Sequence, residues 1–231
     1  MTTRSTAAER RAEGVEPHHT LMDSRVEREP SDRALAARWI TACALGEALG
    51  IAAVATTYAA IDRGHPAPAA PWILGAGAWE GLCLGGAQAV VLRGLGVRPR
   101  IWIALTVLAA AAGYGLSLLG GAGGGGEGSE PELAALLGLG AAMGAVMGAL
   151  MGAIQWAGAR GRLSALSWIG ASALGWAPAM AVIMIVATSV EGSWPLYCIA
   201  LAGAGAGVIA GLFVGAATML ALPRSGAPSD V

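Results

Sequence analysis

Residues 133–157 read LAALLGLGAAMGAVMGALMGAIQWA and contain no charged side chain. A helix of about 20 apolar residues crosses the hydrocarbon layer of a bilayer and satisfies its own backbone hydrogen bonds there. This stretch therefore predicts a membrane-spanning helix. Five further stretches have the same apolar character, and the whole set predicts spans near 39–60, 72–92, 101–119, 133–157, 164–190 and 196–222.

The overall composition agrees with membrane insertion. Hydrophobic residues make up 55% of the 231-residue chain and charged residues only 13%, with a mean hydropathy of +0.62. Soluble domains are about a quarter charged, so this composition excludes an ordinary soluble enzyme. We expect an all-α fold, an integral membrane six-helix bundle over residues 39–222, surrounded by the lipid bilayer.

The two ends of the chain are predicted to be polar tails. Residues 1–38 contain 14 of the 29 charged residues, balance seven arginines against seven carboxylates, and lack the apolar core of a signal peptide. These features predict a disordered cytoplasmic tail. Residues 223–231 are expected to form a second, short tail.

The arginines predict the orientation of the bundle. All 14 basic residues are arginine, and with a cytoplasmic amino terminus only Arg63 falls on the outer side. Loops on the cytoplasmic side of membrane proteins are enriched in Lys and Arg. Both termini are therefore predicted to be cytoplasmic.

A threefold repeat runs through the apolar region. Trp39, Trp102 and Trp168 open the first, third and fifth spans. The second, fourth and sixth spans share glycines four residues apart, at Gly77, Gly81 and Gly85, at Gly144, Gly148 and Gly152, and at Gly207, Gly211 and Gly215. The repeat predicts three transmembrane hairpins, 39–92, 101–157 and 164–222.

Glycines and tryptophans have separate expected places in this bundle. Glycines four apart form a face without side chains, so neighbouring backbones approach closely, and we expect the second, fourth and sixth spans to be the inner elements. The tryptophans are expected at the cytoplasmic membrane interface, where amphipathic rings are favoured.

One part of the repeat resembles a known group of proteins. The residues from Gly148 to Trp156, then Arg160, then Trp168 to Trp176 form the pattern Gly-x3-Gly-x2-Gln-Trp, Arg, Trp-x6-Gly-Trp. It resembles a pattern in small bacterial multispanning membrane proteins of unestablished role, which implies a bacterial plasma (inner) membrane and no particular activity. Alternating Gly and Ala at 203–207 are also similar to rotor-ring proteolipids of ATP synthases, although the third hairpin has no carboxylate in its spans.

Two carboxylates interrupt the predicted spans, Glu47 in the first and Glu80 in the second. Their distances from the intervening turn place them within about 4 Å of the same depth. A charge at the bilayer centre costs roughly 2.5 to 3.5 kcal/mol, and the spans contain no Lys, Arg or His to compensate. At least one carboxyl is therefore expected to be protonated, or a cation to be bound.

These carboxylates leave two interpretations open. In the first they exchange protons or bind a cation in a transport path, whose polar cytoplasmic mouth is formed by Gln88, Gln155, Arg93 and Arg160. In the second they form a neutral pair that hydrogen-bonds and locks the first hairpin. The glutamines have a structural reading of their own, as hydrogen-bond partners between helices.

A metal site is a third hypothesis for the same region. Cys43 and Cys83 lie about one helical turn from Glu47 and Glu80, and two sulfurs with two carboxylates fit a divalent metal. Other polar side chains in the spans, such as Tyr114, are expected to hydrogen-bond between helices.

Two classes of function remain for the whole chain. The sequence contains no catalytic motif, cofactor fingerprint or nucleic-acid motif, so we expect no enzyme activity, no cofactor and no nucleic-acid partner. The sequence favours the first class, a structural or assembly subunit, which engages a membrane-protein partner or a second copy through its glycine-rich faces and its amino-terminal tail. The other is a small proton-linked or cation transporter or channel that uses Glu47 and Glu80.

Overall fold

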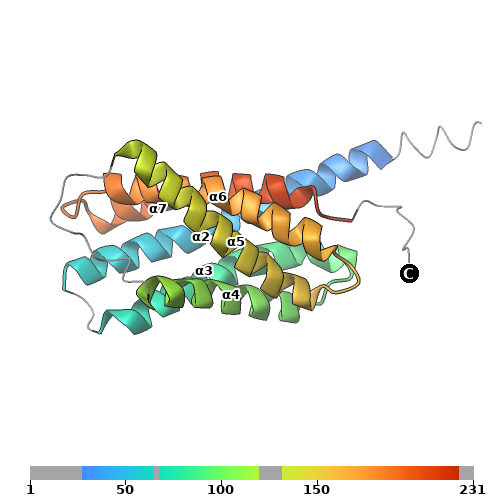
Figure 1. Ribbon diagram of the computed structural model, residues 1–231, viewed down its shortest axis with the longest axis horizontal. Coiled ribbons are helices and arrows are strands. Elements are labelled where there is room, and N and C mark those ends of the chain that lie inside the picture. Colours follow the sequence, from blue (N-terminus) through green and yellow to red (C-terminus); the bar gives the residue numbers. More distant parts are fainter. Residues whose placement is uncertain (1–27, 65–67, 120–131, 224–231) are drawn as a thin grey trace, which may run out of the picture.

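The computed structural model describes the backbone of residues 28–64, 68–119 and 132–223, and side chains from Asp32 onward. Within these ranges the regular structure is entirely helical. The elements are α2 (Arg28–Asp62), α3 (Ala69–Leu92), the short 3-10 helix η2 (Arg93–Leu95), α4 (Pro99–Leu119), α5 (Leu133–Gly158), α6 (Ala165–Ser189) and α7 (Leu196–Met219). Figure 1 shows the long helices running lengthwise, with α5 crossing the others obliquely.

Proline and glycine set several helix ends. Pro68 and Pro195 directly precede α3 and α7, and Pro99 begins α4, because a residue without an N–H fits the first turn. Gly96, with φ 73°, ends η2 in the left-handed conformation that glycine adopts without strain. The predicted start of the second span at residue 72 is three residues late, since α3 begins at Ala69 and accommodates Pro71 in its first turn.

The first helix begins well before the predicted span. Residues 28–38 belong to α2, so this part of the predicted disordered tail is helical. Leu35 packs against the core of the bundle, which stabilises the extension. Arginines at 33 and 38 oppose burial in hydrocarbon but not helix formation, so hydropathy missed the start of the helix. Residues 1–27 and 224–231 of the predicted tails lie outside the described residues.

Five helices are long and apolar enough to cross a membrane: Asp32–Asp62 within α2, together with α4, α5, α6 and α7. They suggest a multi-pass membrane protein. The sequence predicted six such helices, and α3 is the exception. Its 24 residues would suffice in length, but they include Glu80 and Gln88, and no stretch of α3 is apolar enough over the length of a span.

The long helices form a closed ring. Each packs against its neighbours in the chain, and α2 packs extensively against α7, which closes the ring. The contact between α4 and α5 is the smallest of the set. Since α3, α5 and α7 have no substantial contact with one another, the prediction that the second, fourth and sixth spans form an inner core is wrong.

The glycine faces explain the closest of these contacts. Gly81 lies against Val107 of α4, Gly148 against the Ser172 backbone of α6, and Gly211 against Ala44 of α2. A Cβ added to any of these glycines would come within 3.0 Å of backbone atoms. The other members of the three glycine sets make similar close contacts with the same partner helices. The expected close approach is confirmed, but each face packs on the next helix around the ring.

The three tryptophans lie in the interior, not at an interface. Trp39, Trp102 and Trp168 are completely buried. The Trp168 ring meets the other two edge to face, with centroid distances of 6.0 Å to Trp39 and 5.5 Å to Trp102. The prediction that these tryptophans lie at the membrane interface is therefore wrong. Inside the bundle the three indoles pack against one another, and this contact favours burial.

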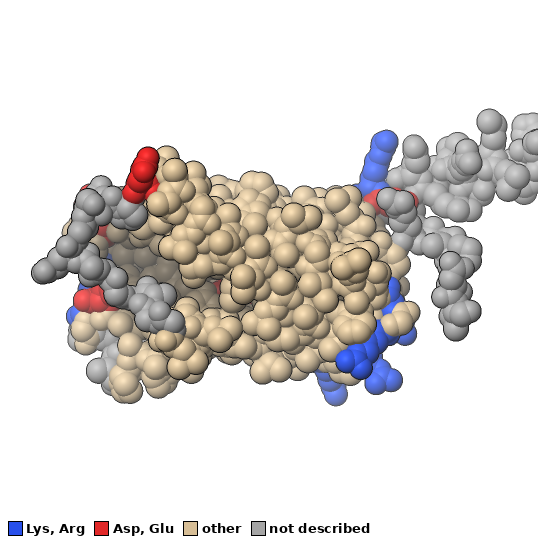
Figure 2. All heavy atoms as spheres, in the orientation of Figure 1, with Lys and Arg blue, Asp and Glu red and all other residues tan. Residues whose placement is uncertain are grey.

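Charged side chains separate to the two ends of the bundle. Figure 2 shows most of the visible arginines at one end and most of the visible acidic side chains at the other, with an almost uncharged surface between them. The arginine end includes Arg98 and Arg162 in loops and Arg100 in the first turn of α4, and Arg162 donates to the Leu95 carbonyl at 3.1 Å. This separation agrees with the asymmetry on which the predicted orientation rests.

Candidate functional site

Glu47 and Glu80, called here the carboxyl pair, lie on facing sides of α2 and α3. Gly50, one turn after Glu47, lets the backbone of α3 approach, because a Cβ there would come within 3.0 Å of the Glu80 Cα and Cγ. On the other side, Gly207 of α7 lies against the backbone carbonyl of Glu47. The carboxyl pair is therefore enclosed where α2, α3 and α7 pack closely together.

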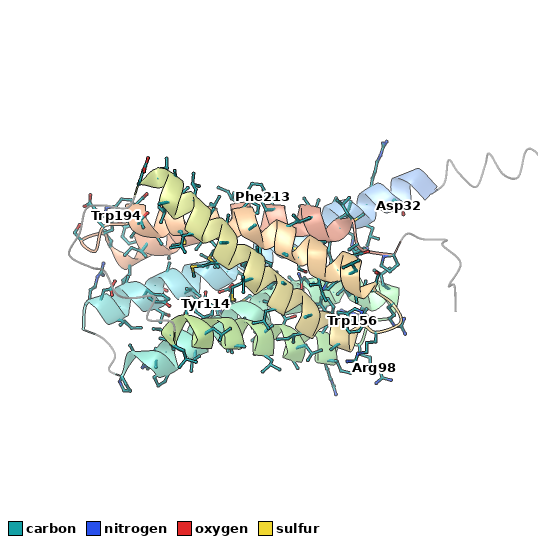
Figure 3. The ribbon with its side chains drawn as sticks, viewed as in Figure 1. Asp32, Arg98, Tyr114, Trp156, Trp194 and Phe213 are labelled. Atoms are coloured by element: carbon teal, nitrogen blue, oxygen red, sulfur yellow. The ribbon has the colours of Figure 1, made fainter. Side chains whose placement is uncertain are left out.

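The two carboxyls differ in their hydrogen bonds. Glu47 has no exposed surface, and neither Oε1 nor Oε2 has a hydrogen-bond partner. Glu80 is 5% exposed, and its Oε2 accepts a hydrogen bond of 2.5 Å from the Tyr114 hydroxyl. Tyr114 reaches the site from α4 and is labelled in Figure 3. One member of the pair is thus anchored and the other is not.

The surroundings of the carboxyl pair contain no cation. The carboxyls interact electrostatically with each other, and their further electrostatic neighbours are Tyr58, Tyr114, Cys43 and Cys83. No arginine or histidine of the described chain interacts with either one. A buried carboxylate without a cation or a donor is costly, so this arrangement favours a bound proton or a bound ion.

The metal hypothesis is not supported. Across residues 32–64, 68–119 and 132–223, no three His, Cys, Asp or Glu side chains lie close enough together to hold a metal ion. Cys43 instead accepts a hydrogen bond of 3.5 Å from Gln88 Nε2. The predicted set of Cys43, Cys83, Glu47 and Glu80 shares a region of the bundle without converging on a point, because spacing along helices fixes depth but not direction.

A second polar cluster, called here the indole layer, consists of Trp39, Trp102, Trp168, Gln88, Gln155 and Thr218. The Trp39 indole N–H donates to Thr218 Oγ1 at 2.9 Å, and the Trp102 indole N–H donates to Gln88 Oε1 at 3.0 Å. Trp168 Nε1 is buried without a partner. All six side chains are 2% exposed or less, so the layer fills the inside of the ring.

The two glutamines connect the layer internally. Gln155 Nε2 donates to Thr106 Oγ1 at 3.0 Å and to Gln88 Oε1 at 3.3 Å. The reading of Gln88 and Gln155 as hydrogen-bond partners between helices is therefore confirmed. The Trp102 indole N–H and the two amides hydrogen-bond to one another here, which lowers the cost of burying them, whereas Trp168 Nε1 stays without a partner.

The predicted polar mouth does not form. Gln88 and Gln155 are enclosed by the tryptophans, whereas Arg93 and Arg160 are exposed at the end of the bundle. Arg160 stacks on the Trp156 ring, with its guanidinium carbon 5.2 Å from the ring centroid. In the first two repeats the arginine follows the glutamine by five residues, but the glutamines are buried inside the bundle and the arginines are exposed at its surface.

Two features of the site were not assigned from the sequence. Tyr114 was expected only as a general hydrogen-bonder, since the sequence gives no sign that its hydroxyl meets Glu80 across two helices. The sequence did contain a pattern that indicates the indole layer, because tryptophans open three spans and Gln88 and Gln155 lie near the ends of two others. Their common depth could have suggested that these groups meet inside the bundle.

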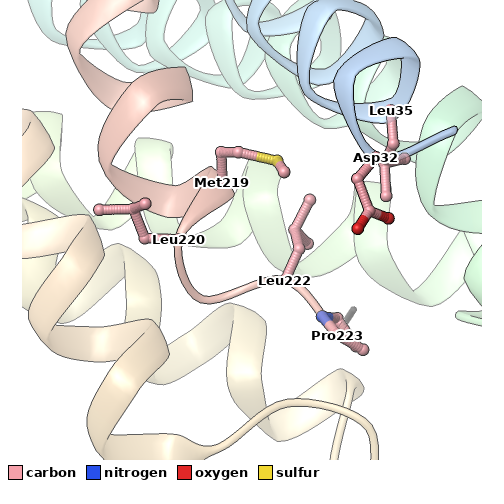
Figure 4. A pocket seen from close by; sticks show the side chains of 6 residues that line it. All are labelled: Asp32, Leu35, Met219, Leu220, Leu222 and Pro223. Atoms are coloured by element: carbon pink, nitrogen blue, oxygen red, sulfur yellow. The ribbon is translucent and has the colours of Figure 1, made fainter. Parts of the chain in front are cut away.

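The surface around the site is hollowed at one end. Figure 2 shows a depression at the acidic end of the bundle, in the region between α5 and α4. Two other hollows lie at the arginine end. One, of about 80 Å³, is formed by α2 and the end of α7 (Figure 4), and the other is an apolar groove between α6 and α7. Neither of these two is lined by a member of the carboxyl pair or the indole layer.

In comparisons with known proteins, no family model matches the chain, and no significant match was found among curated proteins or among solved structures. The resemblance to small bacterial multispanning proteins therefore stays a prediction. Evidence on function comes from the geometry of the two buried clusters.

Proposed function

We propose that the protein is a small membrane transporter or channel in which Glu47 and Glu80 reversibly bind a proton or a small cation. The observation that carries this proposal is the Glu47 carboxyl, which is fully buried with neither oxygen hydrogen-bonded. Ionisable groups inside a membrane protein are expensive, and they commonly mark ion or proton pathways.

The competing reading, a purely structural pair, explains this geometry less well. A carboxyl that locks two helices together would hydrogen-bond to its partner or to a backbone carbonyl, and Glu47 does neither. Each unsatisfied buried polar group costs about 1 to 3 kcal/mol. A residue that lowers stability in this way is better explained by a ligand that it binds.

The proposed architecture is three hairpins, 39–92, 101–157 and 164–222, related by an axis along the membrane normal. Corresponding glycines of the repeat support it. Gly85 packs on Thr106, Gly152 on Ser172 and Gly215 on Cys43, and these three partners occupy matching positions in the sequence repeat. The carboxyl pair belongs to the first hairpin alone, so function is proposed to be a specialisation of one copy.

The proposed orientation puts both termini and the arginine end in the cytoplasm of a bacterial cell, with the protein in the plasma membrane. The hollow at the acidic end would then face outward (Figure 2). The indole layer would lie between the carboxyl pair and the cytoplasm. In this conformation a proton or cation would therefore exchange between the carboxyl pair and the solution on the outer side.

One argument for a role as a structural or assembly subunit is weakened by the packing of the glycine faces. The glycine-rich faces that were expected to engage partners are occupied by helices of the same chain, as with Gly81 on α4, Gly148 on α6 and Gly211 on α2. An assembly role would have to use other surfaces or the amino-terminal tail, which lies outside the described residues. Co-purification of the full chain with a stable membrane partner, combined with absence of flux, would favour it.

The decisive experiment measures ion flux in proteoliposomes that contain the purified full chain. An imposed pH gradient should drive proton or cation flux, and Glu47→Gln and Glu80→Gln should each abolish most of it. Glu132→Gln is the matched control, because Glu132 is an exposed glutamate that precedes α5 and should retain wild-type flux. Equal flux in the wild type and in the Glu47→Gln, Glu80→Gln double variant would refute the proposal.

A further inference from the structure

We infer that the carboxyl pair binds one proton, that this proton resides on Glu47, and that Tyr114 stabilises Glu80 as the carboxylate. The inference deepens the function proposed above by naming the bound species and giving the two acids different roles. Tyr114 is thereby assigned as a positioning residue of the site.

The difference in hydrogen bonding carries the assignment. The Tyr114 hydroxyl donates to Glu80 Oε2 at 2.5 Å. Hydrogen bonds from O–H donors to carboxylates are roughly twice as strong as neutral ones. Glu47 receives no such bond at either oxygen. Negative charge is therefore stabilised at Glu80 and left without support at Glu47.

The position of the donor is built into the packing. The Tyr114 ring lies directly against Gly77, one turn before Glu80 on α3, where any side chain would collide with it. Gly50 of α2 lies against the Glu80 backbone from the other side. Two glycines thus position the phenol and the Glu80 backbone, which restricts the geometry of the hydrogen bond between the two side chains.

The lack of a neighbouring cation requires one of the two carboxyls to be protonated. Glu80 faces Glu47 and Tyr58 on α2, Tyr114 on α4, and Cys83 on its own helix. Glu47 is further faced by Cys43. None of these neighbours is a cation, so two anions would repel each other without compensation. One proton on the unsupported acid leaves one charge, located at the acid that has a donor.

The same geometry favours a proton over a metal cation. Hard metal ions need about six or more oxygen ligands. The described part of the chain brings no group of three acidic, histidine or cysteine side chains together at any point. A proton needs only one carboxyl oxygen.

Infrared spectroscopy of the purified full chain tests where the proton resides. A protonated carboxylic acid has a carbonyl-stretch band that is separate from the carboxylate bands and shifts in D₂O. The wild type should show this band, Glu47→Gln should lose it, and Glu80→Gln should retain it. Tyr114→Phe should change its frequency or intensity, because Glu80 then loses its donor and competes for the proton.

Tyr58→Phe is the matched control for the tyrosine variant. Tyr58 is also an electrostatic neighbour of Glu80, but the hydroxyl that hydrogen-bonds to Glu80 is that of Tyr114. This variant should leave the band unchanged. Thermal unfolding of each variant should establish that it remains folded.

Loss of the band in Glu80→Gln but not in Glu47→Gln would overturn the inference, and so would absence of the band in the wild type. The measurement requires no flux, so it is separable from the transport experiment. A band that belongs to Glu47 in a protein without flux would support the inference and refute the proposed function. Flux that depends on both acids, without an infrared band from Glu47, would support the proposed function and refute the inference.

Discussion

The Trp102 indole on α4 donates its N–H to the Gln88 side-chain oxygen on α3, at 3.0 Å. Trp39 makes the equivalent bond to Thr218, whereas the Trp168 indole N–H has no acceptor. Three tryptophans that match in the sequence repeat therefore differ in hydrogen bonding.

This difference predicts unequal effects of replacing each tryptophan with phenylalanine. All three changes remove the same volume from a buried position, but only Trp39→Phe and Trp102→Phe also remove a hydrogen bond. Bonds of this kind in membrane proteins contribute about 1 kcal/mol. Trp168→Phe should thus be the least destabilising of the three by roughly 1 kcal/mol, as measured by unfolding in mixed detergent micelles. A Trp168→Phe variant less stable than the other two would contradict the assigned hydrogen bonds.

Two glycines on α7 predict opposite responses to alanine. A Cβ at Gly207 would collide with the Glu47 backbone carbonyl, so Gly207→Ala should push α7 from α2 and destabilise the bundle by about 1 to 3 kcal/mol. Gly205, two residues earlier, has no atom within 4 Å of the corresponding position. Gly205→Ala should be neutral or stabilising by up to about 1 kcal/mol, because alanine favours helix. Equal effects in thermal unfolding would show that α7 does not pack on α2 through this face.

Replacing Glu47 with leucine should stabilise the protein while abolishing flux. The change removes two buried oxygens that lack partners, so the expected gain is about 1 to 3 kcal/mol. Gln88→Leu is the matched comparison, because it leaves the Trp102 indole N–H without its acceptor and should destabilise. Melting temperatures of both variants, measured in one detergent, decide the matter. A strongly destabilised Glu47→Leu variant would instead favour a structural role for this carboxyl.

Thiol labelling tests the proposed orientation. In a background of Cys43→Ser, Cys83→Ser and Cys198→Ser, a membrane-impermeant thiol reagent applied to intact cells should modify the Ser193→Cys variant, which lies between α6 and α7. The Arg98→Cys variant, at the arginine end, should react only after the cells are opened, since both native side chains are exposed at opposite ends of the bundle. Labelling of both variants in intact cells would exclude the proposed topology.

Much of the helical architecture was predictable because it depends on local properties. Uncharged stretches such as 133–157 and breakers such as Pro99 identified six helices whose bounds agree with the structure to within a few residues, apart from the start of α2. At the start of α2, hydropathy did not predict where the helix begins. Arg33 and Arg38 oppose burial in lipid but not helix formation, so the helix continues beyond the apolar span.

The site was predictable only in part. Helical rise placed Glu47 and Glu80 at similar depth, and the two carboxyls do interact. The predicted polar mouth failed, because Gln88 and Gln155 turn toward the tryptophans inside the ring while Arg93 and Arg160 remain in solvent. Rise per residue gives depth, whereas the direction of a side chain depends on how the helices are rotated against each other.

The sequence alone determined that the chain is helical and mostly apolar, that glycine faces bring its helices close together, and that two acids occur within the spans. These properties follow from composition and spacing, which act over a few turns of one helix. Only the tertiary structure decided that Tyr114 supports Glu80, that Glu47 has no donor, and that Trp168 lacks the acceptor found by Trp39 and Trp102. A hydrogen bond requires donor and acceptor to meet within about 3 Å, and no single helix fixes a distance between groups on different helices.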